Sequence, residues 1–444
     1  MEKIYFVSLG CDKNLVDSEQ MMALLSEKGY VFTDDISEAG CAVINTCCFI
    51  GDAKEESINT IIEVGSYKEK GSLKALVICG CLAQRYSEEI RSELPEVDAI
   101  VGTTAFDEID RAIKEALEGK GADHLKDRDS YTYLEGRRSL STGGHYAYLK
   151  IAEGCDKSCT YCIIPKVRGR YRSVPMDVLE KEARQLAEDG VSELILVAQE
   201  ITVYGMDLEG RKLLPALLER LCAIEGIKWI RLLYCYPEEI TDELIDVIKR
   251  EPKICHYIDM PVQSGSDNVL KRMGRRCTSA DIEAVVGKLR EAVPDICIRT
   301  TFITGFPGES EEDHRASAEM IKKLRFDRLG VFTYSPEEGT PAFGMEPMID
   351  EEVKLKRLDE LMLLQQQVVF EKNAGLEGSL MDAFIEGRDV ENDVYVARTY
   401  RDAPEVDGLI FIKSDREIMS GTIVRARVTG SGGYDLTGEI EEED

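Results

Sequence analysis

The sequence predicts an α/β protein with an N-terminal parallel α/β sheet domain, a central partial (βα)6 barrel and a C-terminal small β-barrel. Apolar strands alternate with helical patterns over residues 1–118 and again over 141–373. Such alternation is typical of parallel sheets with right-handed crossovers. Short alternating strands then fill 374–441, which favours a small barrel of the OB type. At 444 residues, the chain is long enough for several domains.

The charge balance gives a first indication of the partner. The formal net charge is −29, from 55 basic and 84 acidic side chains. Proteins whose main ligand is a nucleic-acid backbone usually carry a basic patch or domain. The charge therefore favours a basic partner over nucleic acid, although a local basic patch is compatible with an acidic chain.

The sequence also indicates the compartment. No run of about eighteen apolar residues occurs, so we expect no transmembrane helix. Residues 1–7 lack the basic and apolar regions of a signal peptide and are predicted to form a first strand. Fourteen cysteines without an export signal favour metal or redox use in a reducing compartment, so we expect a cytoplasmic protein.

In the N-terminal domain, three cysteines each follow a predicted strand. The strands are expected at 3–9, 41–45, 73–79 and 98–101, and the helices at 15–28, 52–70, 83–94 and 109–117. Ligands gather at the carboxyl ends of parallel strands, so Cys11, Cys47 and Cys81 are expected on one edge as a three-thiol set. The alternative is that they pack as small hydrophobic residues. Cys48 and Cys79 are neighbours that could replace them as ligands, but strand alternation points Cys79 along the strand body.

The next segment, 119–140, is polar and rich in turn residues. We interpret it as a linker, with a short strand possible at 131–134. His124 and His145 fall in or beside it and are expected to be surface histidines. His256 and His314 are expected to have structural roles.

The central domain is expected to contain six βα units, whose functional residues collect at the carboxyl ends of the strands. The predicted strands are 146–152, 194–198, 228–234, 256–260, 296–303 and 328–333. The predicted helices are 176–188, 213–224, 238–250, 267–273, 279–292 and 311–324.

The loop after the first of these strands carries a C-x3-C-x2-C motif made by Cys155, Cys159 and Cys162. Structural zinc requires four protein ligands, and a four-iron cluster needs a ligand on each iron. Three thiolates without a fourth Cys or His nearby therefore leave one iron open for a substrate or cofactor. Tyr161 precedes the last thiol and either stacks on an adenine or packs within the loop.

Several polar residues at strand ends are candidates for binding that cofactor. Gln199 and Glu200 end one strand, Gln263 and Ser264 follow another, and Arg299 is a possible partner for a carboxylate. The alternative for each is a polar strand end that faces solvent. Cys222, Cys235, Cys255, Cys277 and Cys297 are interpreted as packing residues.

The C-terminal domain follows a long helical pattern at 350–372. Its strands are expected at 381–386, 394–399, 408–412, 422–428 and 434–439. Residues 378–444 hold 16 acidic and 7 basic side chains, a net charge of −9. Such an acidic barrel is expected to bind phosphates poorly and is a plausible binding surface for a basic protein.

These motifs resemble the radical S-adenosylmethionine (SAM) methylthiotransferase family over nearly the whole chain. The matching segments are 8–14, 17–19, 45–47, 80–86, 153–169, 261–266, 305–309 and 334–341. The resemblance implies two 4Fe-4S clusters, SAM as cofactor and a C-terminal TRAM domain. It also implies that Cys11, Cys47 and Cys81 hold the second cluster. Cys48 departs from the family pattern, which usually has Gly there, and so leaves the choice between Cys47 and Cys48 open.

In that family, one SAM gives a methyl group to a sulfur held at the N-terminal cluster. A second SAM yields a 5′-deoxyadenosyl radical, which takes hydrogen from a substrate carbon that then collects the methylthio group. This scheme requires the N-terminal sheet edge to face the mouth of the partial barrel.

Two branches of the family differ in substrate: a tRNA adenosine, or an aspartate β-carbon of ribosomal small-subunit protein twelve. Residues 13–14 (Lys-Asn) follow Cys11, where the tRNA branch usually has Met-Asn. Residues 299–301 (Arg-Thr-Thr) stand where that branch tends to place an Asp, and 337–338 (Glu-Glu) where it is often basic. Residues 403–408 also resemble the protein-modifying branch. We therefore expect the ribosomal protein as substrate, with tRNA as the alternative. A flavodoxin or ferredoxin is expected as electron donor, and the protein is expected to be a monomer that does not bind membranes.

Overall fold

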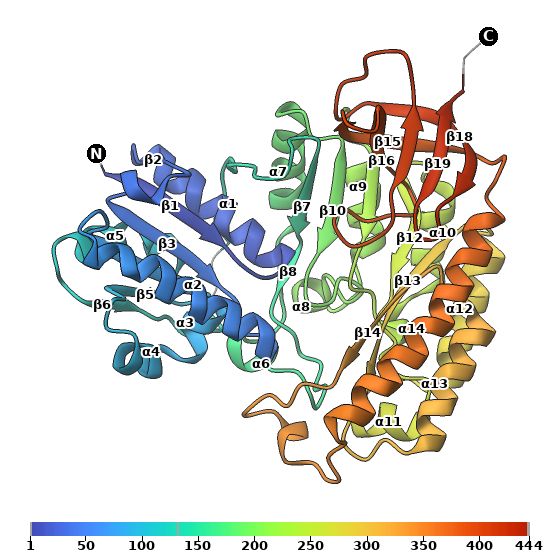
Figure 1. The fold of residues 1–444 in the computed structure, drawn as a ribbon, viewed down its shortest axis with the longest axis horizontal. Helices are drawn as coiled ribbons and strands as arrows, with labels where there is room; N and C mark the ends of the chain where they lie inside the picture. The colour runs from blue at the N-terminus through green and yellow to red at the C-terminus, as the bar shows by residue number, and fades with distance from the viewer. Residues whose placement is uncertain (1, 131–132, 442–444) are drawn as a thin grey trace.

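The computed structural model describes residues 2–130 and 133–441. It contains an N-terminal sheet domain (blue), a central open sheet (green to orange) and a C-terminal barrel (red), as Figure 1 shows. The predicted fold class is confirmed. No helix in the described ranges is long and apolar enough to cross a membrane.

The N-terminal sheet is parallel throughout and has the order β2-β1-β3-β4-β5-β6. Its strands are β1 (Lys3–Ser8), β2 (Val31–Phe32), β3 (Cys41–Thr46), β4 (Ala75–Gly80), β5 (Ala99–Val101) and β6 (Ala122–His124). Its helices are α1 (Asp12–Glu27), α2 (Gly51–Glu69), α3 (Cys81–Arg85), α4 (Ser87–Glu93) and α5 (Ile109–Leu117), with 3-10 turns η1 (Ile36–Glu38) and η2 (Phe106–Glu108). Because β1, β3 and β4 are adjacent and parallel, their carboxyl ends share one edge.

The sequence missed two strands of this sheet, β2 and β6. Each has only two or three residues, too few for an alternating pattern to be recognised. β6 lies inside the predicted linker and extends the N-terminal sheet beyond its expected end. The strand predicted at 131–134 falls partly on residues 131–132, outside the described residues, while Tyr133 and Leu134 belong to no strand.

The central sheet is parallel and open, with the order β14-β13-β12-β11-β10-β7. Its strands are β7 (Tyr146–Lys150), β10 (Glu193–Val197), β11 (Trp229–Leu232), β12 (Ile254–Asp259), β13 (Cys297–Thr304) and β14 (Arg328–Thr333). Its helices are α7 (Met176–Glu188), α8 (Met206–Glu209), α9 (Leu214–Cys222), α10 (Asp242–Arg250), α11 (Asp267–Arg272), α12 (Ser279–Ala292) and α13 (Glu311–Leu324), with turns η3 (Pro237–Glu239) and η4 (Pro341–Gly344). Capping boxes that begin at Thr278 and Ser310 start α12 and α13.

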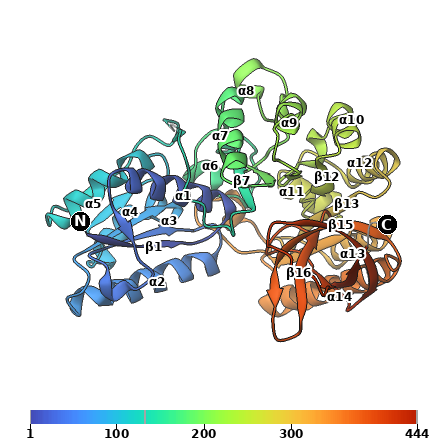
Figure 2. The ribbon, with the colours of Figure 1, turned by 90° about the horizontal axis from the view of Figure 1, so that it is seen from above.

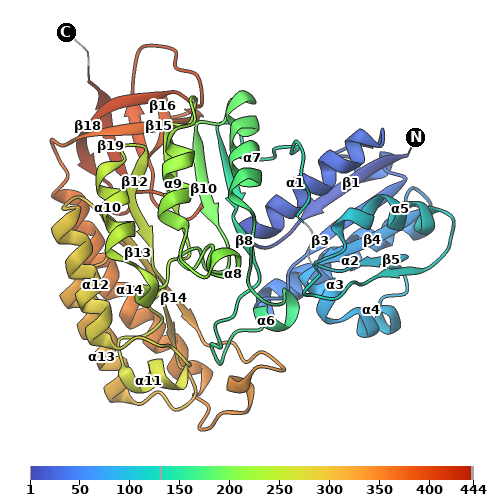
Figure 3. The ribbon, with the colours of Figure 1, turned by 180° about the vertical axis from the view of Figure 1, so that it is seen from behind.

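The cysteine loop of this domain is flanked by a short antiparallel ladder. The ladder pairs β8 (Ala152–Glu153) with β9 (Arg172–Ser173), and α6 (Ile164–Val167) lies between them in sequence. Figures 1 and 3 place α6 between the N-terminal domain and the central strands, where it packs against α3.

The C-terminal domain is a closed barrel with the order β15-β16-β17-β19-β18. Its strands are β15 (Leu380–Asp389), β16 (Val394–Thr399), β17 (Ile410–Lys413), β18 (Ile423–Ser431) and β19 (Leu436–Ile440), and α14 (Glu351–Ala374) leads into it. It sits against the amino ends of the central strands, where Arg398 bonds Glu193 at 2.7 Å and Arg328 bonds Asp402. Figure 2 shows it beside the core, away from the N-terminal sheet.

The expectation that His124 and His145 lie at the surface is wrong, because each is 7% exposed. The ring nitrogens of His124 lie 2.7 and 2.9 Å from carboxylate oxygens of Glu108 and Glu115. His145 lies 2.8 Å from a carboxylate oxygen of Glu386 on β15 and stacks on an aromatic ring of the same strand. Exposure was predicted from the polar residues around both histidines, because the sequence does not show that Glu108, Glu115 and Glu386 fold against them.

Candidate functional site

The C-x3-C-x2-C loop is a tightly held turn at the carboxyl end of the first core strand. Cys155 and Cys159 are each 6% exposed. Gly154 has φ 76°, and a Cβ there would lie 2.0 Å from the Arg170 oxygen, so only glycine fits. The amide of Cys155 donates to the Gly169 oxygen at 3.2 Å, which fixes the loop against the segment between α6 and β9.

The three thiols of this loop are close enough to affect one another electrostatically. Burial raises the pKa of Cys155 to about 12, and neighbouring charges that include Cys159 add to the rise. Burial likewise raises the pKa of Cys162, as do Cys159 and Cys155. Iron would displace the thiol protons, because the thiolate is the ligand.

The N-terminal cysteines meet as the strand topology predicts. Cys11 precedes α1, Cys47 follows β3 and Cys81 begins α3. A Cβ on Gly10 would lie 2.8 Å from the Cys47 Sγ, so glycine leaves room for that thiol beside Cys11. Burial raises the pKa of Cys81, Arg168 opposes the rise, and the charges of Cys48, Cys47 and Cys11 add to it. The structure therefore assembles a second three-thiol set from three loops.

The alternative ligands Cys48 and Cys79 lie differently. Cys48 is 1% exposed and packs in the same hydrophobic cluster as Cys81. Cys79 is fully buried within β4, where its Sγ donates to the Ile44 oxygen at 3.6 Å. The position of Cys79 within β4 favours Cys81 over it, and the proximity of Cys47 to Cys11 favours Cys47 over Cys48. Both ligand assignments stay predictions.

The donor chemistry of both sets fits a four-iron cluster. Each set supplies three thiols, the usual ligands of such clusters, and leaves one iron free. Among the described residues, no group of three Cys, His, Asp or Glu side chains is placed to hold a single metal ion. A cluster spreads its thiolates over different irons, so this finding bears on mononuclear sites only.

A buried network of charged residues, which the sequence analysis missed, joins the two thiol sets. Arg168 contacts the Cys81 Sγ and also pairs with Asp17 of the N-terminal domain. Lys150 and Glu153 of the core complete the network. Asp17, Glu153 and Arg168 all lie in the family-like segments 17–19 and 153–169, but this does not reveal that they meet.

Tyr161 lies beside the core thiols in an aromatic cluster. Its ring packs edge-on against Phe306, with centroids 6.4 Å apart. The hydroxyl of Tyr236, a residue the sequence analysis did not single out, lies 3.8 Å from the Cys159 Sγ. Packing accounts for the position of Tyr161 as well as adenine stacking does, so its cofactor role stays a prediction.

Gln199 and Gln263 are placed to meet a polar ligand. Gln199 donates to a carboxylate oxygen of Glu153 at 2.9 Å. Gln263 adopts φ 74°, an unusual conformation for a residue other than glycine. The Oε1 atoms of both side chains are buried without a hydrogen-bond partner in the described part of the chain. Buried polar atoms of this kind call for a partner, which a bound cofactor would supply.

Glu200, Ser264 and Arg299 are already engaged within the protein. Glu200 is 1% exposed and accepts from the Thr202 hydroxyl at 3.0 Å. Ser264 accepts from the Ser266 amide at 3.1 Å. Arg299 bonds a carboxylate oxygen of Asp259 at 2.9 Å and lies 3.4 Å from one of Asp407 in the C-terminal domain. Its guanidinium thus links core and barrel, and pairing with a cofactor carboxylate stays a prediction.

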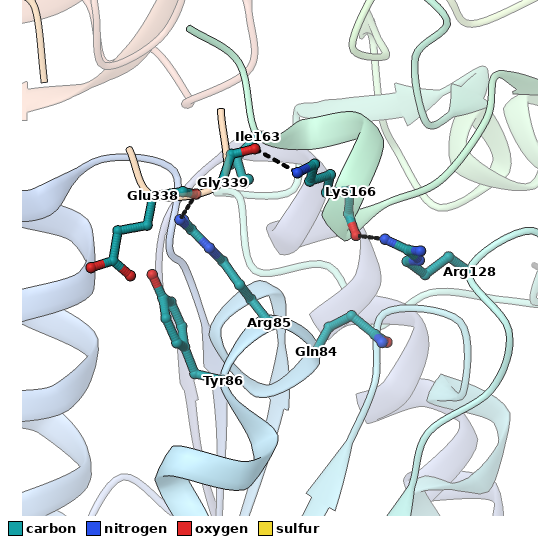
Figure 4. A pocket seen from close by; sticks show the side chains of 8 residues that line it. All are labelled: Gln84, Arg85, Tyr86, Arg128, Ile163, Lys166, Glu338 and Gly339. Atoms are coloured by element: carbon teal, nitrogen blue, oxygen red, sulfur yellow. Dashed lines mark hydrogen bonds between the residues drawn. The ribbon is translucent and has the colours of Figure 1, made fainter. Parts of the chain in front are cut away.

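A pocket of about 400 Å³ opens where α3, α6 and the loop after β14 meet (Figure 4). Its wall includes Ile163, which directly follows Cys162. Lys166 and Arg128 are both exposed. Lys166 donates to the Gly339 oxygen at 2.5 Å, and Arg128 donates to the Lys166 oxygen. Both cations thus bond main-chain oxygens, which leaves their charge available to an acidic partner.

Comparison with known families matches all three domains. Residues 3–102 match Uncharacterized protein family UPF0004, 149–321 match the Radical SAM superfamily and 378–440 match the TRAM domain. A solved structure with a similar fold is the radical SAM methyltransferase TsrM from Kitasatospora setae, with a tryptophan substrate and a SAM analogue bound. Its TM-score is 0.55 at 14% identity, over 74% of this chain and 73% of that chain. Fold and thiol loop thus define a radical SAM protein.

Relatives that align over the full length of the chain identify its family within the radical SAM proteins. The ribosomal protein uS12 methylthiotransferase RimO of Lachnoclostridium phytofermentans is 56% identical over 439 residues, which cover 99% of this chain and 100% of the relative. The protein of the same name from Clostridioides difficile is 47% identical over 440 residues, or 99% of both chains. The chain belongs to the RimO family of ribosomal protein uS12 methylthiotransferases.

Proposed function

We propose that the protein adds a methylthio group to the β-carbon of an aspartate in ribosomal protein uS12, small-subunit protein twelve. It does so with SAM and two 4Fe-4S clusters. The observation that carries the proposal is the pair of three-thiol sets, one at each domain's sheet edge and joined by a buried network. One set alone accounts for radical formation, whereas sulfur insertion needs the second.

When bound, the two clusters and SAM supply the radical and the methylated sulfur. The side chains of the protein would hold the two clusters and SAM in position. Cys155, Cys159 and Cys162 would hold one cluster on a loop that is fixed by the segment between α6 and β9. Cys11, Cys47 and Cys81 would hold the other. The buried amide oxygens of Gln199 and Gln263, which have no partner among the described residues, would orient SAM in the core. The aromatic cluster of Tyr161, Phe306 and Tyr334 would exclude water beside it.

The C-terminal barrel supports a protein substrate. Its net charge of −9 over residues 378–444 attracts a basic ribosomal protein and repels a phosphate backbone. The alternative substrate, a tRNA adenosine, would need a surface that attracts phosphates, which the acidic barrel does not offer.

The deciding experiment offers both substrates to the same enzyme. The anaerobically reconstituted protein is incubated with SAM, a reductant and either uS12 or unmodified tRNA. We expect a methylthio mass increase on one aspartate of uS12. Modification of tRNA alone would reverse the assignment, and 5′-deoxyadenosine without either product would leave a radical SAM enzyme with another substrate.

We also propose a flavodoxin or ferredoxin as electron donor, docked at Lys166 and Arg128. Ile163 connects this pocket directly to Cys162, which gives electrons a short path to the core cluster. We expect Lys166→Glu to slow flavodoxin-driven 5′-deoxyadenosine formation at low salt by at least about tenfold, because charge complementarity steers association. The dithionite-driven rate should stay unchanged.

The control for this prediction is Lys322→Glu, which reverses an exposed charge on α13. It should leave both rates at the parent value. If Lys166→Glu slows the dithionite reaction equally, Lys166 acts on the cluster itself. If it slows neither reaction, the donor docks elsewhere.

The raised pKa of the Glu200 carboxyl group leads us to expect that SAM binding depends on pH. Burial raises its pKa to about 7; Lys157, 3.7 Å away, opposes the rise, and Glu239 and Glu238 add to it. The side chain is thus mostly neutral at pH 6 and mostly a carboxylate at pH 8, and only the carboxylate attracts the cofactor's ammonium group. We expect the SAM affinity of the cluster-loaded protein to rise by about tenfold over this range.

Equilibrium binding of SAM at pH 6, 7 and 8 measures this effect. Glu200→Gln cannot ionise, so its affinity should be nearly constant over the range. An equal slope in parent and variant would assign the pH dependence to another group, and a flat parent profile would show that Glu200 does not face SAM.

We further propose that the protein acts in the cytoplasm as a monomer. The described cysteines are all free, which suits a reducing compartment, and ribosomal proteins are made there. Light scattering of the reconstituted protein would test the oligomeric state.

A further inference from the structure

Arg168 is a buried cation that lies between the two thiol sets. Its side chain is 1% exposed. Its Nε donates to the Cys81 Sγ at 3.3 Å. Its Nη1 donates to a carboxylate oxygen of Asp17 at 2.9 Å and to one of Glu153 at 2.8 Å, and its Nη2 donates to the Asn14 amide oxygen. One guanidinium therefore bonds a thiol, two carboxylates and an amide.

These partners come from both domains. Asp17 and Asn14 belong to α1, which begins next to Cys11, whereas Glu153 belongs to the core and lies two residues before Cys155. Lys150 reinforces the junction, since it bonds Asp17 and also Glu153 at 2.9 Å. The position of each thiol set is therefore coupled to the other through buried ion pairs.

The geometry requires arginine. Its planar fork presents five N–H donors in fixed directions, whereas a lysine ammonium is a point charge on a flexible stem. A lysine at position 168 cannot bond the Cys81 sulfur and both carboxylates at once. A glutamine would leave Asp17 and Glu153 with less positive charge to balance them, which is costly for buried groups.

We propose that Arg168 is a positioning residue that holds the N-terminal thiol set against the core loop. We also infer, on the basis of the proposed function, that Arg168 raises the reduction potential of the cluster bound by that thiol set. Hydrogen bonds to cluster sulfurs and nearby charge set such potentials. A cation against the Cys81 sulfur stabilises the reduced state, which carries one more negative charge. The core domain thereby adjusts the electronic state of a cluster held by the other domain.

The test isolates the N-terminal cluster. In a Cys155→Ala, Cys159→Ala, Cys162→Ala background, only that cluster is expected to be loaded, and its midpoint potential is measured by EPR-monitored redox titration. We expect Arg168→Gln to shift the potential downward and Arg168→Lys to shift it less. Arg231→Lys is the matched control, because Arg231 is equally buried and pairs with Glu193, away from both thiol sets. It should leave the potential unchanged.

Equal potentials in the parent and both Arg168 variants, at full iron content, would overturn the proposal. Failure of both variants to bind the N-terminal cluster would also overturn it, because Arg168 would then serve assembly rather than tuning. A downward shift in Arg168→Lys alone, if Arg168→Gln does not fold, supports it. None of these readouts needs methylthio transfer, so they stay valid even if the protein fails to modify uS12.

Discussion

Replacing Cys159 with alanine is expected to abolish 5′-deoxyadenosine formation by the reconstituted protein. Cys159 is the middle thiol of a buried loop whose three sulfurs are mutual neighbours. A cluster that loses one of three thiolates has two open irons and is poorly held. Loss of a mere outer-shell partner costs roughly 10–100-fold in metal affinity or activity, so loss of a ligand should cost more. Iron content and product formation under dithionite measure the effect.

The matched control is Cys222→Ala. Cys222 ends α9 and is 9% exposed, so it is a buried thiol of the same domain that belongs to neither set. Its replacement should leave iron content and product formation close to the parent values. A Cys159→Ala variant that still formed 5′-deoxyadenosine would contradict the assignment of this loop as the radical-forming site.

The sequence predicted the parts of this site that depend on local pattern and sheet topology. C-x3-C-x2-C is a local motif, and Cys11, Cys47 and Cys81 follow strands that parallel pairing must bring to one edge. The sequence did not predict β2 and β6, because these strands are too short to show an alternating hydrophobic pattern. Sheet topology thus brings together three thiols that lie more than thirty residues apart in sequence.

The contacts between domains could not be predicted in the same way. Arg168 meets Asp17 across 151 positions of sequence, and Arg398 meets Glu193 across 205. Charged residues are usually solvated, so only the packed structure reveals that these are buried. His145 was misjudged for the same reason, because its partner Glu386 belongs to a different domain.

Replacing Cys47 with alanine is expected to stop methylthio transfer while SAM cleavage continues at close to the parent rate. The two sets lie in separate domains, so loss of the N-terminal cluster leaves the core loop intact. The variant should form 5′-deoxyadenosine and no methylthio-aspartate. Mass spectrometry of uS12 and chromatography of the nucleoside products measure both from one reaction.

Cys48→Ala is the stringent control, because it removes the adjacent thiol. Cys48 packs in the core of the N-terminal domain, whereas Cys47 lies at the Gly10 turn beside Cys11. The Cys48 variant should therefore lose some stability through a small cavity and keep methylthio transfer. If instead Cys47→Ala transfers normally and Cys48→Ala does not, the second thiol is the ligand. The loop after β3 would then have to rearrange on binding iron, since in this structure Cys47 neighbours both Cys11 and Cys81, whereas Cys48 neighbours Cys81.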